Sequence, residues 1–177
     1  WRNILNLFQE NERDNKLLLS SVGDGIYSID SEGLATFVNP ACARMLGWET
    51  QDMIGKNIHR IHHHTHADGS HYPVEQCPIY KAVHDGVIHE GRQEIFWRRD
   101  GSSFPVEFTS TPVISDGRIV GAVVVFRDIT ERRSTENQLQ SALEELKVLK
   151  DRLEEQNAYL QEEIHIEHNY REIVGQS

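Results

Sequence analysis

The sequence predicts an α+β fold, in which a five-stranded antiparallel sheet carries short helices on one face and is flanked by an N-terminal helix and a long C-terminal helix. Two strand-like runs come first, short helical segments follow, and three more strand-like runs precede the long helix. Strands grouped apart from helices favour an antiparallel sheet with helices on one face. The last strand, over residues 118–128, is rich in valine and nearly continuous in apolar residues, which is typical of a central strand buried on both faces.

Helix-starting residues and turn signals set the element boundaries. Asn39 and Pro40 fit an N-cap and a first helical residue, and Asp100-Gly101 and Asp116-Gly117 are two-residue turn signals between strands. Residues 57–77 have no usable period and are rich in His, Asp and Gly, so a loop is expected there. The expected elements in chain order are helix 1–22, strands 26–30 and 34–38, helices 41–46, 50–54 and 78–83, strands 93–99, 104–114 and 118–128, and helix 131–170.

Composition and charge limit the range of functions. The formal net charge of −10 over 177 residues argues against a nucleic-acid-binding surface, because phosphate binding needs clustered Lys and Arg. Cys42 and Cys77 form no C-x-x-C pair and fit a reducing compartment, and no apolar run approaches the ~20 residues of a membrane span. We therefore expect a cytoplasmic protein. A start at Trp1 without Met and an end in mid-pattern at Ser177 predict a piece of a longer protein.

Several short motifs, each weak alone but specific in this order, resemble the PAS domain family over about residues 17–133. They are Gly25-Ile26-Tyr27-Ser28-Ile29-Asp30 with Gly33, Phe37-Val38-Asn39-Pro40-Ala41, Leu46-Gly47-Trp48, Arg99-Asp100-Gly101-Ser102-Ser103-Phe104-Pro105-Val106-Glu107 and Asp128-Ile129-Thr130-Glu131-Arg132. The resemblance implies a five-stranded sheet whose helices form a cup, used for sensing, for dimerisation or for both. The predicted organisation is an N-terminal helix at 1–22, a PAS domain at 23–130 and a signalling helix at 131–170.

The resemblance also implies that Asp128, Ile129 and Thr130 join the last strand to the signalling helix, with the Asp and Thr side chains holding this signal junction. Residue spacing favours a helix start at the same place, because Asp128 and Glu131 stand three apart, as in a reciprocal cap. A strand that passes directly into a long helix can carry a change in the sheet into that helix.

The long helix carries an apolar repeat of seven residues. The d positions are Leu139, Leu146, Leu153 and Leu160, and the a positions are Leu143, Lys150, Asn157 and Ile164. This seam predicts a parallel coiled-coil homodimer in which the two polar a positions fix the register at a cost in stability. The alternative is a lone surface helix.

The C-terminal stretch at 153–164 and 172–177, which includes Glu172-Ile173-Val174-Gly175-Gln176-Ser177, is similar to the linker and opening residues of the AAA+ domain in sigma-54-dependent transcriptional activators. This likeness implies that residues 171–177 begin an AAA+ domain acting on sigma-54 RNA polymerase. No G-x-x-x-x-G-K-[ST] motif occurs within the chain. The alternative is the input domain of a histidine kinase, although no His-Glu or His-Asp followed by Arg or Lys and Pro appears before the end.

Eight histidines within residues 59–89, together with a cysteine, raise the possibility of a metal site. Imidazole and thiolate are usual zinc ligands, and the candidates are His62, His66 and Cys77, which would make the domain a metal or redox sensor. Asp68-Gly69 and Pro73 disfavour a helix that would align His62 with His66. The competing interpretation is a polar surface loop without metal.

The expected cup offers a small-molecule pocket, lined by Phe37, Met45, Leu46, Ile54, Ile61, Ile79, Phe96, Phe108 and Val124. The alternative is a cup filled by its own side chains. Cofactor motifs of the family are not supported: neither cysteine lies in the flavin-binding Asn-Cys-Arg-Phe-Leu context, and the expected haem-ligand position falls near Gly86. We expect no enzymatic activity, because no orienting group or oxyanion site accompanies Cys77.

Overall fold

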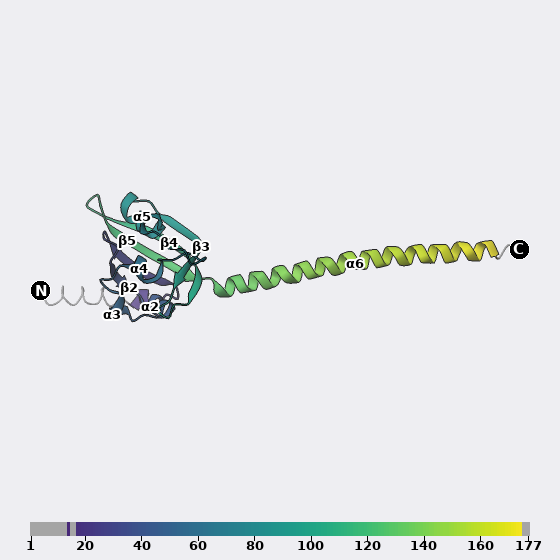
Figure 1. Cartoon of the computed structure of the whole chain (residues 1–177), viewed down its shortest axis with the longest axis horizontal. Coiled ribbons are helices and arrows are strands. Elements are labelled where there is room, and N and C mark those ends of the chain that lie inside the picture. The colour runs from purple at the N-terminus through teal and green to yellow at the C-terminus, as the bar shows by residue number, and fades with distance from the viewer. Residues whose placement is uncertain (1–13, 15–16, 175–177) are drawn as a thin grey trace. The chain divides into compact units, whose positions relative to one another are not determined.

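The computed structural model describes residues 14 and 17–174, with side chains described up to residue 162. Five antiparallel strands form one sheet in the order β2-β1-β5-β4-β3, and Figure 1 labels all of them except β1. The strands are β1 Gly25–Asp30, β2 Ala35–Val38, β3 His89–Trp97, β4 Ser103–Ser115 and β5 Arg118–Asp128. The predicted five-stranded antiparallel sheet is confirmed, and the valine-rich β5 lies at its centre.

Short helices cover one face of the sheet. They are α2 Pro40–Leu46, α3 Thr50–Met53, α4 Ile58–His62, the 3-10 helix η1 Val74–Gln76, and α5 Pro78–Asp85. α4 lies in the segment for which a loop is predicted. It begins where the Asn57 side chain accepts a hydrogen bond from the backbone N–H of Arg60, at 3.1 Å. A five-residue helix is too short to show a hydrophobic period in the sequence, which explains the difference.

Strand β3 also begins earlier than the sequence predicts, at His89 instead of residue 93. Its pairing with β4 shifts between Gly91 and Glu94, and Gln93 between them has a φ of 63°. This irregularity interrupts the alternation of apolar and polar residues from which strands are predicted. Gly91 is required at its position, because a Cβ there would lie 2.1 Å from the ring of Phe108.

The two ends of the chain are described in part. Residues 17–21 are helical, as predicted, whereas the rest of the predicted N-terminal helix falls mainly on residues 1–13 and 15–16, outside the described residues. The long helix α6 spans Thr130–Val174, and residues 175–177 lie outside the described residues. Contacts divide the chain into two units, one ending at Thr130 and the other beginning at Glu131. In the described ranges, 14 and 17–174, no helix has the length and apolar character that crossing a membrane requires.

The core lies between the helices and the inner face of the sheet. Aromatic rings from three strands meet there, with ring centres of Phe96 and Phe126 5.1 Å apart and those of Tyr27 and Phe126 6.1 Å apart. Leu46 and Met53 close the core from the side of the helices, and both are fully buried. These large side chains fill most of the space between the helices and the sheet.

Asn39 holds the strand β1, the helix α2 and the N-terminal segment together. Its side-chain oxygen accepts hydrogen bonds from the backbone N–H groups of Ile26, at 2.9 Å, and Cys42, at 2.8 Å. Its amide nitrogen donates to the carbonyl oxygens of Leu19, at 3.1 Å, and Asp24, at 3.0 Å. The side chain is fully buried, so water cannot bond to these polar groups, and the hydrogen bonds to Asn39 satisfy them instead.

We expect Asn39→Ala to lower the free energy of unfolding by at least about 2 kcal/mol, because it leaves several buried backbone groups without partners. Asn57→Ala is the matched control, since Asn57 caps α4 through one hydrogen bond, and its loss should cost about 1 kcal/mol or less. Urea unfolding followed by tryptophan fluorescence measures both. Equal losses in the two variants would contradict the role given to Asn39.

Candidate functional site

The junction between β5 and α6 is held by Asp128. Its Oδ1 accepts hydrogen bonds from the backbone N–H of Thr130, at 2.9 Å, and from the hydroxyl of Thr130, at 2.5 Å. Its Oδ2 accepts from the guanidinium of Arg98, at 3.3 Å, which itself stacks on the ring of Phe104. Ile129 is buried, and its N–H donates to the carbonyl oxygen of Pro105, at 3.0 Å. The first residue of α6 is therefore bonded to the end of β5, and the junction is anchored to β4 and to Arg98.

The predicted seam residues lie on α6 with their apolar side chains open to solvent in the single chain. Lys150 forms an ion pair with Glu154 at 3.5 Å, and Ile164 lies beyond the residues whose side chains are described. The five described leucines of the seam are 51 to 62% exposed, namely Leu139, Leu143, Leu146, Leu153 and Leu160. A long helix in water depends mostly on burying one face against a partner. These leucines provide such a face.

The residues predicted to line a ligand pocket do not all reach the core. Met45 and Ile61 pack at its edge, and Ile54 is 43% exposed just after α3. Phe37 is half-buried and pairs with Ser28, while the neighbouring Val38 pairs with the buried Tyr27. Five of the predicted residues belong to the core, namely Leu46, Ile79, Phe96, Phe108 and Val124.

Between α4, α5 and the sheet lies a cavity of about 10 Å³. A volume of this size holds about one water molecule or one ion, so it cannot accept a larger organic ligand without rearrangement. Of the predicted pocket residues, Ile79 alone is in contact with it. The lining consists of Ile29, Gly33, Asn57, Ile58, His59, His63, Cys77, Ile79 and Tyr80.

Three metal-ligating side chains of this lining converge. His59 lies on α4, and His63 caps its C-terminus one turn later, where its backbone N–H donates to the carbonyl oxygen of His59. Cys77 stands at the start of α5, and the ligand atoms of the three residues lie within 4.8 Å of one another. Of the predicted metal ligands the structure brings only Cys77 into this group. His62 packs its ring 4.2 Å from the centre of Phe96, and His66 stacks on Tyr72 at 3.9 Å. The i, i+4 spacing of His59 and His63 would have identified them, had α4 been predicted.

Burial determines the ionisation of this region. It lowers the pKa of His59, and it lowers the pKa of the fully buried His62 well below its usual range. It raises the pKa of the Cys77 thiol to about 11 and that of the Cys42 thiol further. Reactive cysteines have lowered pKa values and access to solvent, so neither thiol has the environment of a redox-reactive cysteine.

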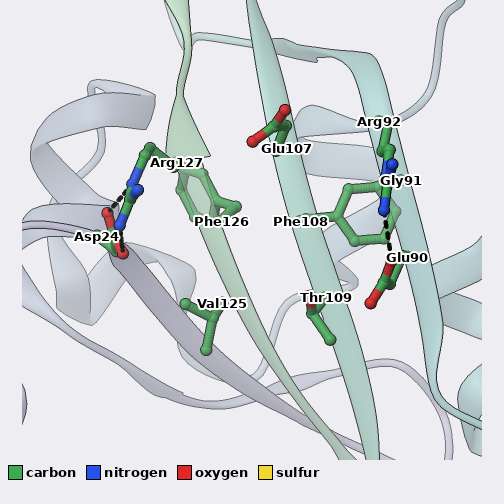
Figure 2. Close-up of a pocket in the computed structure, with 10 residues that line it drawn as sticks. All are labelled: Asp24, Glu90, Gly91, Arg92, Glu107, Phe108, Thr109, Val125, Phe126 and Arg127. Atoms are coloured by element: carbon green, nitrogen blue, oxygen red, sulfur yellow. Dashed lines mark hydrogen bonds and ion pairs between the residues drawn. The ribbon is translucent and has the colours of Figure 1, made fainter.

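The outer face of the sheet bears a broad hollow of about 340 Å³, shown in Figure 2. Its charged side chains bond one another: Arg127 on β5 makes two hydrogen bonds of 2.8 Å to Asp24, and Arg92 pairs with Glu90 at 3.7 Å. Because these charges are largely compensated within the hollow, they select neither an anionic nor a cationic ligand.

The sequence profile of the family described as the PAS fold matches residues 13–129. The chain belongs to the PAS family. A PAS domain of an HTR-like protein from Haloarcula marismortui has the same fold, with a TM-score of 0.56 and 19% sequence identity over 73% of this chain and 100% of that one. The resemblance to the PAS family is thus confirmed, and the PAS domain is a sensory module.

Two relatives carry similar PAS sequences within much longer proteins. The chain is 30% identical over 137 residues to a probable diguanylate cyclase, DgcE, from Escherichia coli strain K12. It is 24% identical over 140 residues to the signal transduction histidine-protein kinase AtoS of the same organism. These matches cover 75% and 79% of this chain but only 12% and 22% of the two relatives.

Proposed function

We propose that this chain is the sensory input region of a dimeric signalling protein, which transmits a change in the PAS domain through Asp128 to Thr130 into α6. The observation that carries the proposal is the continuity of β5, the junction and α6. The central strand ends at Asp128, and the Asp128 carboxylate holds the first residue of α6 by two hydrogen bonds. A shift of β5 or of Arg98 therefore changes the start of the helix directly.

The proposed active form is a homodimer joined along α6. The exposed leucines of the seam recur every seven residues, and pairing two such helices removes them from water. Lys150 and Asn157 at a positions favour one register at some cost in stability. A change at the junction would then alter the packing of two helices together.

Three effector classes fit this input region. The similarity to AtoS favours a histidine kinase, and the similarity to DgcE extends the comparison to a second class of signalling enzyme. The resemblance of residues 153–164 and 172–177 to sigma-54-dependent activators favours an AAA+ ATPase. Because of the similarity to AtoS, we propose a histidine kinase as the first candidate. Because of the C-terminal sequence, an activator of sigma-54 RNA polymerase is the second candidate.

Incubating the full-length protein with γ-labelled ATP separates these candidates. A histidine kinase should acquire acid-labile label on the protein, whereas an AAA+ activator should release inorganic phosphate and remain unlabelled. A Lys→Ala substitution in any downstream G-x-x-x-x-G-K-[ST] motif should abolish that release. Label on a histidine rejects the sigma-54 candidate, and ATP hydrolysis without label rejects the kinase.

We expect Asp128→Ala to release the start of α6 while costing the domain only about 1 kcal/mol of stability, the usual effect of losing a helix cap. Phe96→Ala, a core truncation, should cost about 3–5 kcal/mol. Hydrogen exchange should show the protection of the Thr130 amide, which donates to Asp128, reduced about fivefold, which corresponds to about 1 kcal/mol.

Asp100→Ala is the matched control for this change. Asp100 accepts the same pair of hydrogen bonds, from the N–H and hydroxyl of Ser102, in the turn between β3 and β4. Its loss should leave exchange in α6 unaltered. The coupling role of Asp128 is rejected if Asp128→Ala destabilises the domain as much as Phe96→Ala does, or if both Asp variants affect α6 equally.

We expect Leu146→Glu to raise the dimer dissociation constant by about 100-fold or more, because two buried leucines per dimer each contribute about 1.5–3 kcal/mol. Val148→Glu is the control, since Val148 lies at an f position away from the seam and is 67% exposed in the single chain. Sedimentation equilibrium measures both variants. A monomeric wild-type chain, or equal weakening by both substitutions, would disprove the coiled-coil dimer.

A further inference from the structure

The small cavity beneath α4 has the chemistry of a metal site. It is lined by two imidazoles and one thiol, and His63 Nδ1 lies 3.2 Å from the Sγ of Cys77. Both of these residues are fully buried, and His59 is half-buried. The rest of the lining is mainly apolar, so the three groups face one another with little competition from water.

Hydrogen bonds on the far side of each imidazole fix which nitrogen carries the proton. His59 Nε2 lies 2.8 Å from the carbonyl oxygen of Tyr72, which can only accept, so Nε2 is protonated. His63 Nε2 lies 3.5 Å from Oε2 of Glu94, a carboxylate oxygen that also accepts. In both rings the Nδ1 atom is left with its lone pair.

The lone pair of His63 Nδ1 points to Cys77 Sγ, at 3.2 Å, and becomes free to bind a cation once the thiol proton leaves. Nδ1 of His59 is buried and has no hydrogen-bond partner among the described residues. Buried nitrogens without a partner are uncommon in folded proteins and require a reason. A histidine that ligates a metal through one nitrogen usually donates the other N–H to a carbonyl or carboxylate, which is the arrangement of both His59 and His63.

We propose that His59, His63 and Cys77 bind one divalent transition-metal ion of the zinc type, with a fourth coordination position open to water. Imidazole and thiolate select such ions over Mg²⁺ and Ca²⁺, which prefer oxygen ligands. Binding replaces the thiol proton of Cys77, which leaves to solvent, with the metal. The Cys77 thiolate and the carboxylate of Glu94, which contacts the far side of the His63 ring, together balance the two positive charges of the ion.

The geometry requires only a small closure. Bond lengths of 2.0–2.1 Å to nitrogen and about 2.3 Å to sulfur place tetrahedral ligand atoms about 3.3–3.6 Å apart. The separation of His63 and Cys77 already lies near this range, and the whole set lies within 4.8 Å. Side-chain movements of about 1 Å bring the three groups to one ion. The proposed metal site depends only on the PAS fold and not on the proposed signalling through α6. An experiment that rejects one of these proposals therefore leaves the other untouched.

Titration of the chain, purified without a histidine tag and treated with EDTA, tests the site. Co²⁺ should bind with a stoichiometry of one per chain, giving a thiolate-to-cobalt charge-transfer band and the visible bands of a tetrahedral complex, and Zn²⁺ should displace it. Cys77→Ala should abolish the charge-transfer band. His63→Gln and His59→Gln should each weaken binding by at least about 100-fold, and Glu94→Gln by about 10–100-fold.

Matched controls separate this site from the other histidines and the other thiol. His66→Gln and Cys42→Ala change residues outside the set and should leave affinity and spectrum unaltered. Circular dichroism in EDTA checks that each variant folds. If Cys77→Ala does not fold, His59→Gln still tests the site, because His59 is only half-buried. The proposal is overturned by the absence of binding at micromolar Co²⁺ or Zn²⁺, or by binding that persists unchanged in the folded His59→Gln or Cys77→Ala protein.

Discussion

The central place of β5 in the sheet is the constraint on which the rest of the structure depends. It pairs with β1 on one side, from Gly25 opposite Phe126 to Asp30 opposite Gly121, and with β4 along its whole length on the other. Its inward side chains, including Val124 and Phe126, are fully buried. Because β5 is paired on both sides, the strand cannot move without changing two ladders, and its last residue begins the junction with α6.

Most of this framework can be predicted from the sequence, because local signals and global packing agree. Asp-Gly turns mark both hairpins of the last three strands, and Asn39-Pro40 marks the start of α2. The helix α4 and the start of β3 could not be predicted in this way. α4 is a short helix whose sequence, Ile58–His62, has no apolar period of its own, and β3 passes through an irregularity at Gln93.

The site is less predictable than the fold, since it depends on those same two elements. His62 and His66 have helical spacing in the sequence, but α4 ends at His62, so no helix aligns them. The pair that the structure aligns is His59 and His63, the residue that caps the C-terminus of α4 and donates its backbone N–H to the carbonyl oxygen of His59. Likewise Phe37 and Ile54 are as apolar as the core residues, and only the register of β2 and the end of α3 place them outside it. The residue types in the sequence indicate that metal-ligating and apolar side chains are present in the helical layer. The boundaries of the helices and strands determine which of these side chains come together.

The candidate metal site and the junction are connected through one strand. Glu94, which orients His63, lies on β3, and Arg98, one residue beyond the end of β3, holds the Asp128 carboxylate. Between them, Trp97 donates a hydrogen bond to the carbonyl oxygen of Thr65, at 2.8 Å, which joins the histidine-rich segment to the same strand. A ligand changes an equilibrium only by its difference in affinity for the two states. An ion that draws His59, His63 and Cys77 together favours the arrangement in which α4 lies closest to α5. In this arrangement His63 also holds Glu94 on β3. The end of β3 places Arg98 against Asp128 at the start of α6, so a bound ion would affect α6 through this strand.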